Sequence, residues 1–205
     1  MTIEKLFTIL WMVVMLVLLL IRRAHYGGYS AAGKQTAVDL PGQMRLTFLM
    51  SLGYLYIPLF FALLGLWDNS FAQGISSLLG VKLPVYLRLA GLGSLGLSVL
   101  LFFLVHREMK TNWSPYLELN NEHKLITSGP FAIVRHPMYT SFLLTVLGHG
   151  LMLSNWFVLL SGIVTFWIFF RCRIDAEEKM LADFFGAEYT AYRQKTRKKL
   201  IPFIY

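Results

Sequence analysis

A short run in the second half of the chain has the residue types and the spacing of a ligand-binding site. Arg135 and His136 directly precede Pro137, at the start of a long stretch without Asp, Glu, Lys or Arg. Charge at the edge of such a stretch is costly unless it contacts a partner or a ligand. Proline suits the first position of a helix, and the backbone N–H groups at that end accept an anion such as a ligand carboxylate. The run from Arg135 to Tyr139 therefore predicts the binding of a charged ligand.

A second charged cluster lies further along the chain. Arg173 and Glu177 are four residues apart, so on a helix they share one face. Together with His123 and the first cluster, they are candidates to converge at one end of the last two apolar segments. Other interpretations stay open, since Arg173 and Glu177 also fit a surface ion pair and His136 also fits a helix cap.

The composition indicates a membrane protein. The 205-residue chain is 56% hydrophobic and only 15% charged, which is too apolar for an ordinary soluble domain. Its apolar segments suit a bilayer whose hydrocarbon core is roughly 30 Å thick. The predicted spans are Ile3–Ile21, Leu46–Trp67 with a kink at Pro58, Pro84–Val105 with Arg88 extending toward the headgroups, and two helices separated by Ser154 and Asn155.

The last two predicted helices are short. Each has about fifteen residues, which covers roughly 22 Å and is less than the hydrocarbon core. Either each helix continues into polar sequence on one side, or the pair forms a re-entrant hairpin. We expect continuation on the side that carries Arg135 and Arg171. The predicted fold is an all-α integral membrane bundle of five transmembrane helices, the last two forming a helical hairpin.

Lys and Arg are concentrated on one predicted side of the membrane. They follow the first span, occupy the segment from Val105 to Pro137 and crowd the tail after Phe170, whereas the Asp68–Leu83 loop holds Lys82 alone. The positive-inside rule then predicts that the N-terminus is outside and that the polar segments and the C-terminus are cytoplasmic. Attraction to anionic headgroups accounts for the net charge of +8, so we expect no nucleic-acid partner.

The residues argue against several other kinds of site. Cys172 is the only cysteine, which excludes an internal disulfide and a thiolate metal cluster. No zinc-site spacing such as His-Glu-x-x-His occurs, so no metal is predicted. The first span has no Ala-x-Ala pattern and is followed by Arg22 and Arg23, which favours an uncleaved anchor. His149, within the fourth span, is expected to pack or to hydrogen-bond a neighbouring helix.

We divide the chain into two parts of one structural unit. Residues 1–106 form a three-span scaffold without a cluster of reactive side chains. Within it, Ala90, Ser94 and Ser98 recur four residues apart, with Gly91, Gly93 and Gly96 among them, and small residues at that spacing let transmembrane helices approach closely. Residues 107–205 form the working half, with a polar segment, the helical hairpin and a C-terminal helix.

Three blocks in the working half carry a resemblance to a known family. They are His123-Lys-Leu-Ile-Thr-Ser-Gly-Pro-Phe131, Arg135-His136-Pro137-Met138-Tyr139, and Arg173-x-x-x-Glu177-Glu178 followed by Phe185-Gly186-x-Glu188-Tyr189-x-x-Tyr192. In this order they resemble the isoprenylcysteine carboxyl methyltransferase family, especially its short, five-span prokaryotic members. The segments Asn112-Trp113-Ser114 and Ser154-Asn155-Trp156 add to the likeness. The resemblance covers residues 107–205 well and the first half only by span count.

The resemblance implies S-adenosylmethionine as the cofactor and a set of residues that hold it. The positions that match are His123, Lys124, Leu125, Ile126, Phe131, His136, Pro137, Met138, Tyr139 and Glu177. The arginine that matches Arg173 serves the substrate and is the catalytic candidate. Many members have Tyr where this chain has Phe131, and the adjacent Glu178 leaves open which acid faces the cofactor.

The implied reaction is methyl transfer to the carboxylate of a lipophilic acceptor, such as a C-terminal isoprenylcysteine. A C-terminal carboxyl group has a pKa of about 3.5, so it is already anionic and needs no base. Charge is neutralised as the methyl group moves, which a low-dielectric site at the membrane rim favours. The implied partners are the lipid bilayer and a prenylated or other lipophilic carboxylate, and the implied location is a prokaryotic cytoplasmic membrane rather than the endoplasmic reticulum.

Three alternatives remain at this point. A lipid amine methyltransferase acting on a phospholipid headgroup would need a base, for which His136 or Glu178 could serve. An NADPH-dependent membrane sterol or enone reductase is another, because some of these enzymes also carry Arg-His-Pro-x-Tyr. It would need more basic and polar contacts for a dinucleotide than the sequence offers. The third is a membrane scaffold without catalytic activity.

Overall fold

The computed structural model describes residues 2–26, 34–36, 40–67, 70–112, 117–120 and 123–201. The connector from Gly27 to Gly33 and six positions of the polar segment, residues 113–116 and 121–122, lie outside the described residues.

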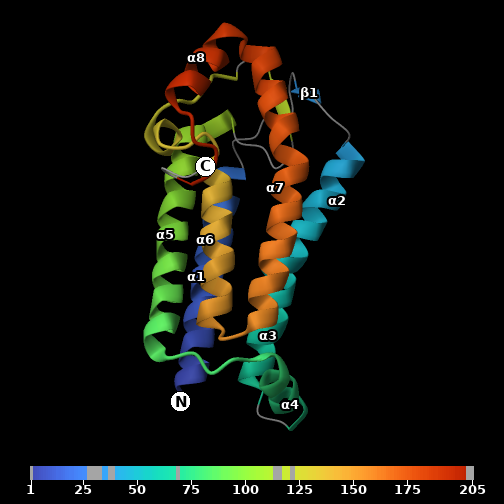
Figure 1. Cartoon of the computed structure of the whole chain (residues 1–205), viewed down its shortest axis with the longest axis vertical. Coiled ribbons are helices and arrows are strands. Elements are labelled where there is room, and N and C mark those ends of the chain that lie inside the picture. Colours follow the sequence, from blue (N-terminus) through green and yellow to red (C-terminus); the bar gives the residue numbers. More distant parts are fainter. Residues whose placement is uncertain are drawn as a thin grey trace.

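Long apolar helices dominate the structure (Figure 1). Within the described residues, four helices are long and apolar enough to cross a membrane. They are α1 (Ile3–Tyr26), the continuous helix of α2 (Leu40–Ser51), η1 (Leu52–Tyr56) and α3 (Ile57–Leu66), then α5 (Val85–Met109) and α7 (Trp156–Phe185). The shorter α6 (Pro137–Met152) lies among them. The protein is therefore an all-α, multi-pass integral membrane protein.

The two ends of the bundle differ. The N-terminus and α4 (Ser70–Leu79) lie at one end, and α8 (Ala187–Lys195) lies at the other (Figure 1). At the α8 end, β1 (Lys34–Thr36) and β2 (Glu118–Asn120) form an antiparallel pair that the sequence analysis did not predict. Two short 3-10 helices, η2 (Lys110–Asn112) and η3 (Gly129–Ala132), belong to the connection between α5 and α6.

Proline affects two of the helices differently. Near Pro58, where a kink was expected, the second span has a π-helical segment, η1, that ends two residues before the proline. At α6 the predicted continuation toward Arg135 is wrong, because the helix begins at Pro137. A residue before proline is biased away from helical geometry, and His136 has φ −126° and ψ 62°. The prediction is right for α7, which continues past Arg171 to Phe185.

Small residues bring α5 and α6 into close contact. The Ser94 hydroxyl donates to the carbonyl oxygen of Leu144 at 2.7 Å, and the Ser98 hydroxyl donates to that of Ser141 at 2.8 Å. Ala90, expected on the same face, is instead exposed. Its place at the interface is taken by Gly91, one residue further along the helix.

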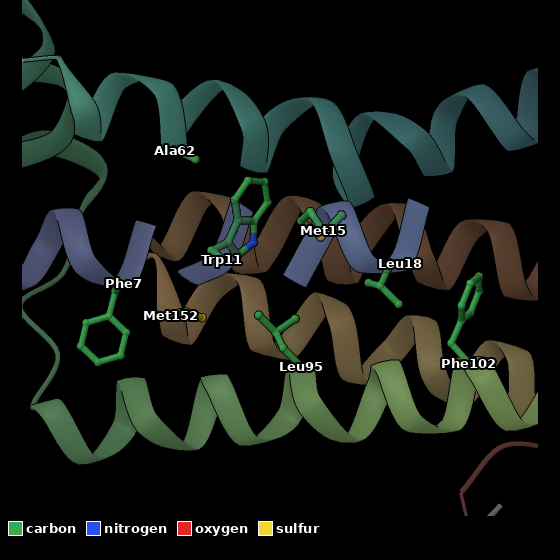
Figure 2. Packing of buried hydrophobic residues seen from close by; sticks show 8 residues of the cluster. All are labelled: Phe7, Trp11, Met15, Leu18, Ala62, Leu95, Phe102 and Met152. Atoms are coloured by element: carbon green, nitrogen blue, oxygen red, sulfur yellow. The ribbon is translucent and has the colours of Figure 1, made fainter. Parts of the chain in front are cut away.

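A buried core joins α1 to these two helices (Figure 2). It is formed by Phe7, Trp11, Met15, Leu18, Ala62, Leu95, Phe102 and Met152. The Trp11 indole also donates a hydrogen bond to Nδ1 of His149 at 2.7 Å, which confirms the expected helix–helix contact of that histidine. This core holds α6 in place although α6 is short.

Arg88 does not extend toward the headgroups as expected. It is buried, and it donates to the Glu4 carboxylate at 2.6 Å and to the carbonyl oxygen of Met152 at 3.0 and 3.2 Å. Pairing a buried charge and capping the last carbonyls of α6 together stabilise this end of the bundle.

The glycine at the α5–α6 contact gives a test of this packing. A Cβ atom at Gly91 would lie 2.9 Å from the backbone nitrogen of Met152, whereas one at Gly96 would meet nothing within 4 Å. We expect Gly91→Ala to destabilise the protein by about 1–3 kcal/mol through overpacking and to lower the thermal unfolding midpoint in detergent. Gly96→Ala, on the same helix, should be neutral or slightly stabilising. Equal midpoints for the two variants would contradict the packing described here.

Candidate functional site

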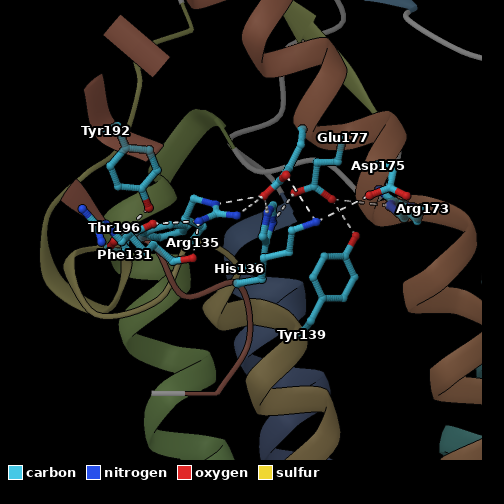
Figure 3. Close-up of polar contacts among 12 residues, drawn as sticks. Phe131, Arg135, His136, Tyr139, Arg173, Asp175, Glu177, Tyr192 and Thr196 are labelled. Carbon is cyan, nitrogen blue, oxygen red and sulfur yellow. Dashed lines mark hydrogen bonds and ion pairs between the residues drawn. The ribbon is translucent and has the colours of Figure 1, made fainter. Parts of the chain in front are cut away.

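The two charged clusters meet at the α8 end of the bundle (Figure 3). The Tyr139 hydroxyl donates to Oε2 of Glu177 at 2.6 Å, and Nδ1 of His136 lies 3.2 Å from Oε1 of the same carboxylate. Nε of Arg173 lies 4.0 Å from Glu177 Oε2. The first turn of α6 therefore holds the Glu177 side chain from one side, while Arg173 lies one helical turn away on α7.

Arg135 has a structural part in this arrangement. Its guanidinium donates to Oε1 of Glu178 at 2.7 and 2.9 Å and to the carbonyl oxygens of Thr196 and Arg197 at 2.8 and 2.7 Å. The backbone N–H groups of Arg135 and His136 also donate to the carbonyl oxygens of Lys198 and Lys199. The arginine thus ties the segment after α8 to the start of α6 and to α7.

The two adjacent acids have different surroundings. Glu178 is buried and pairs with Arg135, and its Oε2 lies 3.4 Å from the ammonium of Lys199. Glu177 lines the two cavities described next, and Glu178 is not among the described lining residues of either. The geometry therefore makes Glu177 the acid that is available to a ligand.

Two cavities open beside these residues. The first lies between the helices and is lined by Arg22, Thr47, Met50, Ser51, Tyr54, Phe102, Met109, Phe131, Arg135, His136, Pro137, Met138, Tyr139, Phe142, Phe169, Arg173 and Glu177. The second lies toward α8 and is lined by Met109, Asn112, Leu117, Leu119, His123, Lys124, Leu125, Ile126, Phe131, Arg135, Arg173, Glu177, Met180, Leu181, Phe185, Tyr189 and Tyr192. Five residues line both: Met109, Phe131, Arg135, Arg173 and Glu177. The cavities therefore share one wall, which carries the charged groups.

The structure divides the predicted cofactor residues between these cavities. His123, Lys124, Leu125 and Ile126 line only the second cavity, whereas the run from His136 to Tyr139 lines only the first. Hydrogen bonds to Asn112 hold the 123–126 segment in place, since the His123 ring lies 3.0 Å from the Asn112 carbonyl oxygen and the Asn112 amide donates to that of Lys124.

The side chain of Phe131 lies in the shared wall. Its carbonyl oxygen accepts a hydrogen bond from the Tyr192 hydroxyl at 2.8 Å, which ties η3 to α8 (Figure 3). The aromatic side chain that departs from the family pattern therefore faces both cavities.

The sequence analysis missed the contribution of the first half of the chain. It placed no site residue before residue 107, yet Arg22 of α1 and four residues of the second span line the first cavity. A signal was present in that span: Thr47 and Ser51 are four residues apart in an uncharged stretch, so they share one helix face. Both residues line the first cavity.

The electrostatic surroundings of His136 and His123 differ. Burial alone would lower the pKa of His136, but its hydrogen bonds to Glu177 and Glu178 and their negative charges outweigh burial and raise the pKa above the ordinary value. Burial lowers the pKa of His123, and the hydrogen bond to the Asn112 carbonyl oxygen opposes this effect only in part. His136 therefore favours the charged imidazolium, which holds the two adjacent carboxylates together.

A comparison with known proteins shows which family this part of the chain resembles. Residues 91–183, which contain the whole shared wall, match the model of the isoprenylcysteine carboxyl methyltransferase (ICMT) family. This region of the chain is therefore similar to ICMT proteins. The matched region begins within α5 and ends near the end of α7, so α1 and the second span lie outside it.

Individual relatives named as isoprenylcysteine methyltransferases match over a similar length of the chain. A probable protein-S-isoprenylcysteine O-methyltransferase of Oryza sativa subsp. indica is 41% identical over 88 residues, which are 43% of this chain and 46% of the relative. The protein-S-isoprenylcysteine O-methyltransferase of Homo sapiens is 40% identical over 87 residues, 42% of this chain and 30% of the relative. The chain thus matches less than half of these relatives' length.

The fold likeness extends further than the sequence match. A solved structure of the eukaryotic intramembrane Ras methyltransferase ICMT has a TM-score of 0.53 and 25% identity, covering 82% of this chain and 54% of that one. The arrangement of helices around the site is therefore similar to that of a known ICMT.

The raised pKa of His136 predicts a pH dependence of stability. Because the folded state binds this proton more tightly than the unfolded chain, the stabilisation is fully present below pH 6.5, the ordinary value, and is lost as pH rises through the raised pKa. We expect the thermal unfolding midpoint of the wild-type protein to fall as pH rises above that value, and His136→Gln to remove this part of the fall. His123→Gln is a control, because a lowered pKa contributes a slope of opposite sign. Parallel profiles for wild type and His136→Gln would contradict the assignment.

Proposed function

We propose that this chain is an S-adenosylmethionine-dependent carboxyl methyltransferase whose acceptor is a lipophilic carboxylate such as a C-terminal isoprenylcysteine. The observation that supports it best is the pair of cavities with a common wall that contains Arg173 and Glu177. A reaction between a water-soluble donor and a lipid-bound acceptor needs two such compartments that meet at the reacting atoms. Proteins named as protein-S-isoprenylcysteine O-methyltransferases are among the relatives.

The residues of the second cavity suit the donor. Its walls include Leu125, Ile126, Leu181 and Phe185, which offer an apolar surface to a purine ring. The Glu177 carboxylate at the shared wall complements a positively charged ligand. When bound, the donor supplies an electrophilic methyl group on a sulfonium. The residues present therefore fit the cofactor that the family resemblance implies.

The residues of the first cavity suit the acceptor. Met50, Phe102, Phe142 and Phe169 provide an apolar lining for a hydrocarbon tail between the helices. At the shared wall, Arg173 provides a guanidinium for the acceptor carboxylate, and it lies over the Phe169 ring with 5.4 Å between its Cζ atom and the ring centroid. Contact with one carboxylate oxygen would leave the other as the nucleophile.

The chain's own groups position the two reactants and remove water from them, and they transfer no protons. The acceptor carboxylate is already ionised, so no base is required. Tyr139 and His136 fix the Glu177 carboxylate, and the largely apolar lining of the two cavities would exclude water from both reactants. Arg22 and Arg173 beside the first cavity disfavour an ammonium acceptor, which argues for a carboxylate rather than a phospholipid amine.

We extend this proposal to the membrane. α6, with sixteen residues, would be the fifth span, helped by its tight packing on α5. The site end of the bundle would face the cytoplasm and the N-terminus the outside, as the distribution of Lys and Arg favours. The first 106 residues would then act as a scaffold that also shapes the acceptor cavity.

Purified protein in detergent provides the test of function. Calorimetry with S-adenosylhomocysteine and with NADPH should show binding of the first and none of the second. Labelled S-adenosylmethionine should then transfer its methyl group to N-acetyl-S-farnesylcysteine and form a base-labile ester. Binding of NADPH without S-adenosylhomocysteine would favour a reductase, and a base-stable methylamine product from phospholipid would favour an amine acceptor.

The proposed substrate role of Arg173 gives a separate prediction. Arg173→Ala should lower turnover by roughly 100-fold or more through loss of acceptor positioning, while the affinity for S-adenosylhomocysteine is kept. Arg171→Ala is the matched control, because it removes an exposed arginine from the same helix. Full turnover in Arg173→Ala, or a loss confined to cofactor affinity, would reject the role.

A further inference from the structure

Tyr189 carries a polar atom that the folded chain does not satisfy. The residue is 1% exposed, and its hydroxyl is buried without a hydrogen-bond partner among the residues that the structure describes. Buried tyrosine hydroxyls usually find a partner, and leaving one unpaired is destabilising. Tyr192, one helical turn later in α8, shows the ordinary arrangement, since its hydroxyl donates to the Phe131 carbonyl oxygen. The unpaired hydroxyl therefore requires an explanation outside the fold.

The position of Tyr189 suggests where that partner would be. The residue lines the second cavity together with Phe185 and Tyr192, and it does not belong to the described lining of the first. It also borders another cavity together with Thr190 and Arg193. A phenylalanine would fill the same space without burying an unpaired hydroxyl. Packing of the wall alone thus gives no reason for a tyrosine here, whereas a ligand in the second cavity would.

The hydroxyl is in a form that can serve such a ligand. Burial raises the pKa of Tyr189 to about 12, and the negative charge of Glu178 acts in the same direction. The group therefore remains protonated at physiological pH, so that it can donate a hydrogen bond as well as accept one.

The two cavities also indicate which part of the ligand would be close to Tyr189. Arg173 and Glu177 lie in the shared wall, where the methyl group must pass from one cavity to the other. Tyr189 lines the second cavity and not the first, and the other residues of the second cavity include Leu125, Ile126 and Phe185, which suit a purine nucleoside. We propose that the Tyr189 hydroxyl hydrogen-bonds the adenosine half of S-adenosylmethionine, an inference that rests on the proposed function.

Tyr189→Phe tests this contact because it removes one oxygen atom and keeps the ring. Calorimetry should show that the variant binds S-adenosylhomocysteine about three- to tenfold more weakly than the wild-type protein. It should bind 5′-methylthioadenosine, which keeps the adenosine but lacks the amino-acid portion, more weakly by the same factor. Unchanged affinity for S-adenosylhomocysteine would overturn the proposal. A loss for S-adenosylhomocysteine alone would overturn the assignment to the adenosine half.

Thermal unfolding of the ligand-free protein separates this role from a structural one. Because the hydroxyl has no partner among the residues that the structure describes, Tyr189→Phe should leave the unfolding midpoint unchanged or raise it. Tyr192→Phe, the matched control, should lower the midpoint, since the Phe131 carbonyl oxygen loses its donor. A midpoint lowered equally by both variants would overturn the proposal. Failure of the wild-type protein itself to bind S-adenosylhomocysteine would instead reject the proposed function.

Discussion

The site depends on the hydrogen bonds that residues at the start of α6 make with the Glu177 carboxylate. Tyr139 donates to one carboxylate oxygen, and the His136 imidazole lies within hydrogen-bond distance of the other. A carboxylate at the edge of an apolar bundle is stable only when it is hydrogen-bonded and charge-compensated. Because this contact joins α6 to α7, it also fixes the wall that the two cavities share. Without it, the two cavities would have no defined common wall.

The surrounding structure keeps that contact in register. α7 extends past the bundle and carries Arg173 and Glu177 to the level where α6 begins. Arg135 then joins Glu178 to the segment that follows α8, so the end of the described chain folds back over the site. At the far end, the buried Arg88 closes the bundle around the last turn of α6. Two buried arginines thus stabilise opposite ends of the short helix that presents Tyr139.

The sequence was sufficient for the features that depend on local chemistry. Hydropathy predicted the long spans, Pro137 predicted the start of a helix, and the blocks around His136 and Glu177 predicted the likeness to the ICMT family. Features that depend on tertiary contacts were missed. Arg88 was expected at the headgroups, because nothing in the sequence pairs it with Glu4. Of the small residues expected at a helix interface, Gly91 and Ser98 lie there, whereas Ala90 is exposed. The contribution of Arg22 and the second span to the first cavity was missed, although the spacing of Thr47 and Ser51 gave a signal for the second span.

Central to the proposed function is the contribution of Glu177 to cofactor binding. If the second cavity holds the sulfonium donor, the Glu177 carboxylate must contribute to cofactor affinity, whereas an exposed acid on the same helix must not. Titration calorimetry with S-adenosylhomocysteine on wild type, Glu177→Gln and Asp183→Asn compares these cases, since Asp183 is exposed on α7. We expect Glu177→Gln to weaken binding by at least roughly tenfold and Asp183→Asn to bind like the wild-type protein. Equal affinities for all three proteins would contradict the placement of the cofactor beside Glu177.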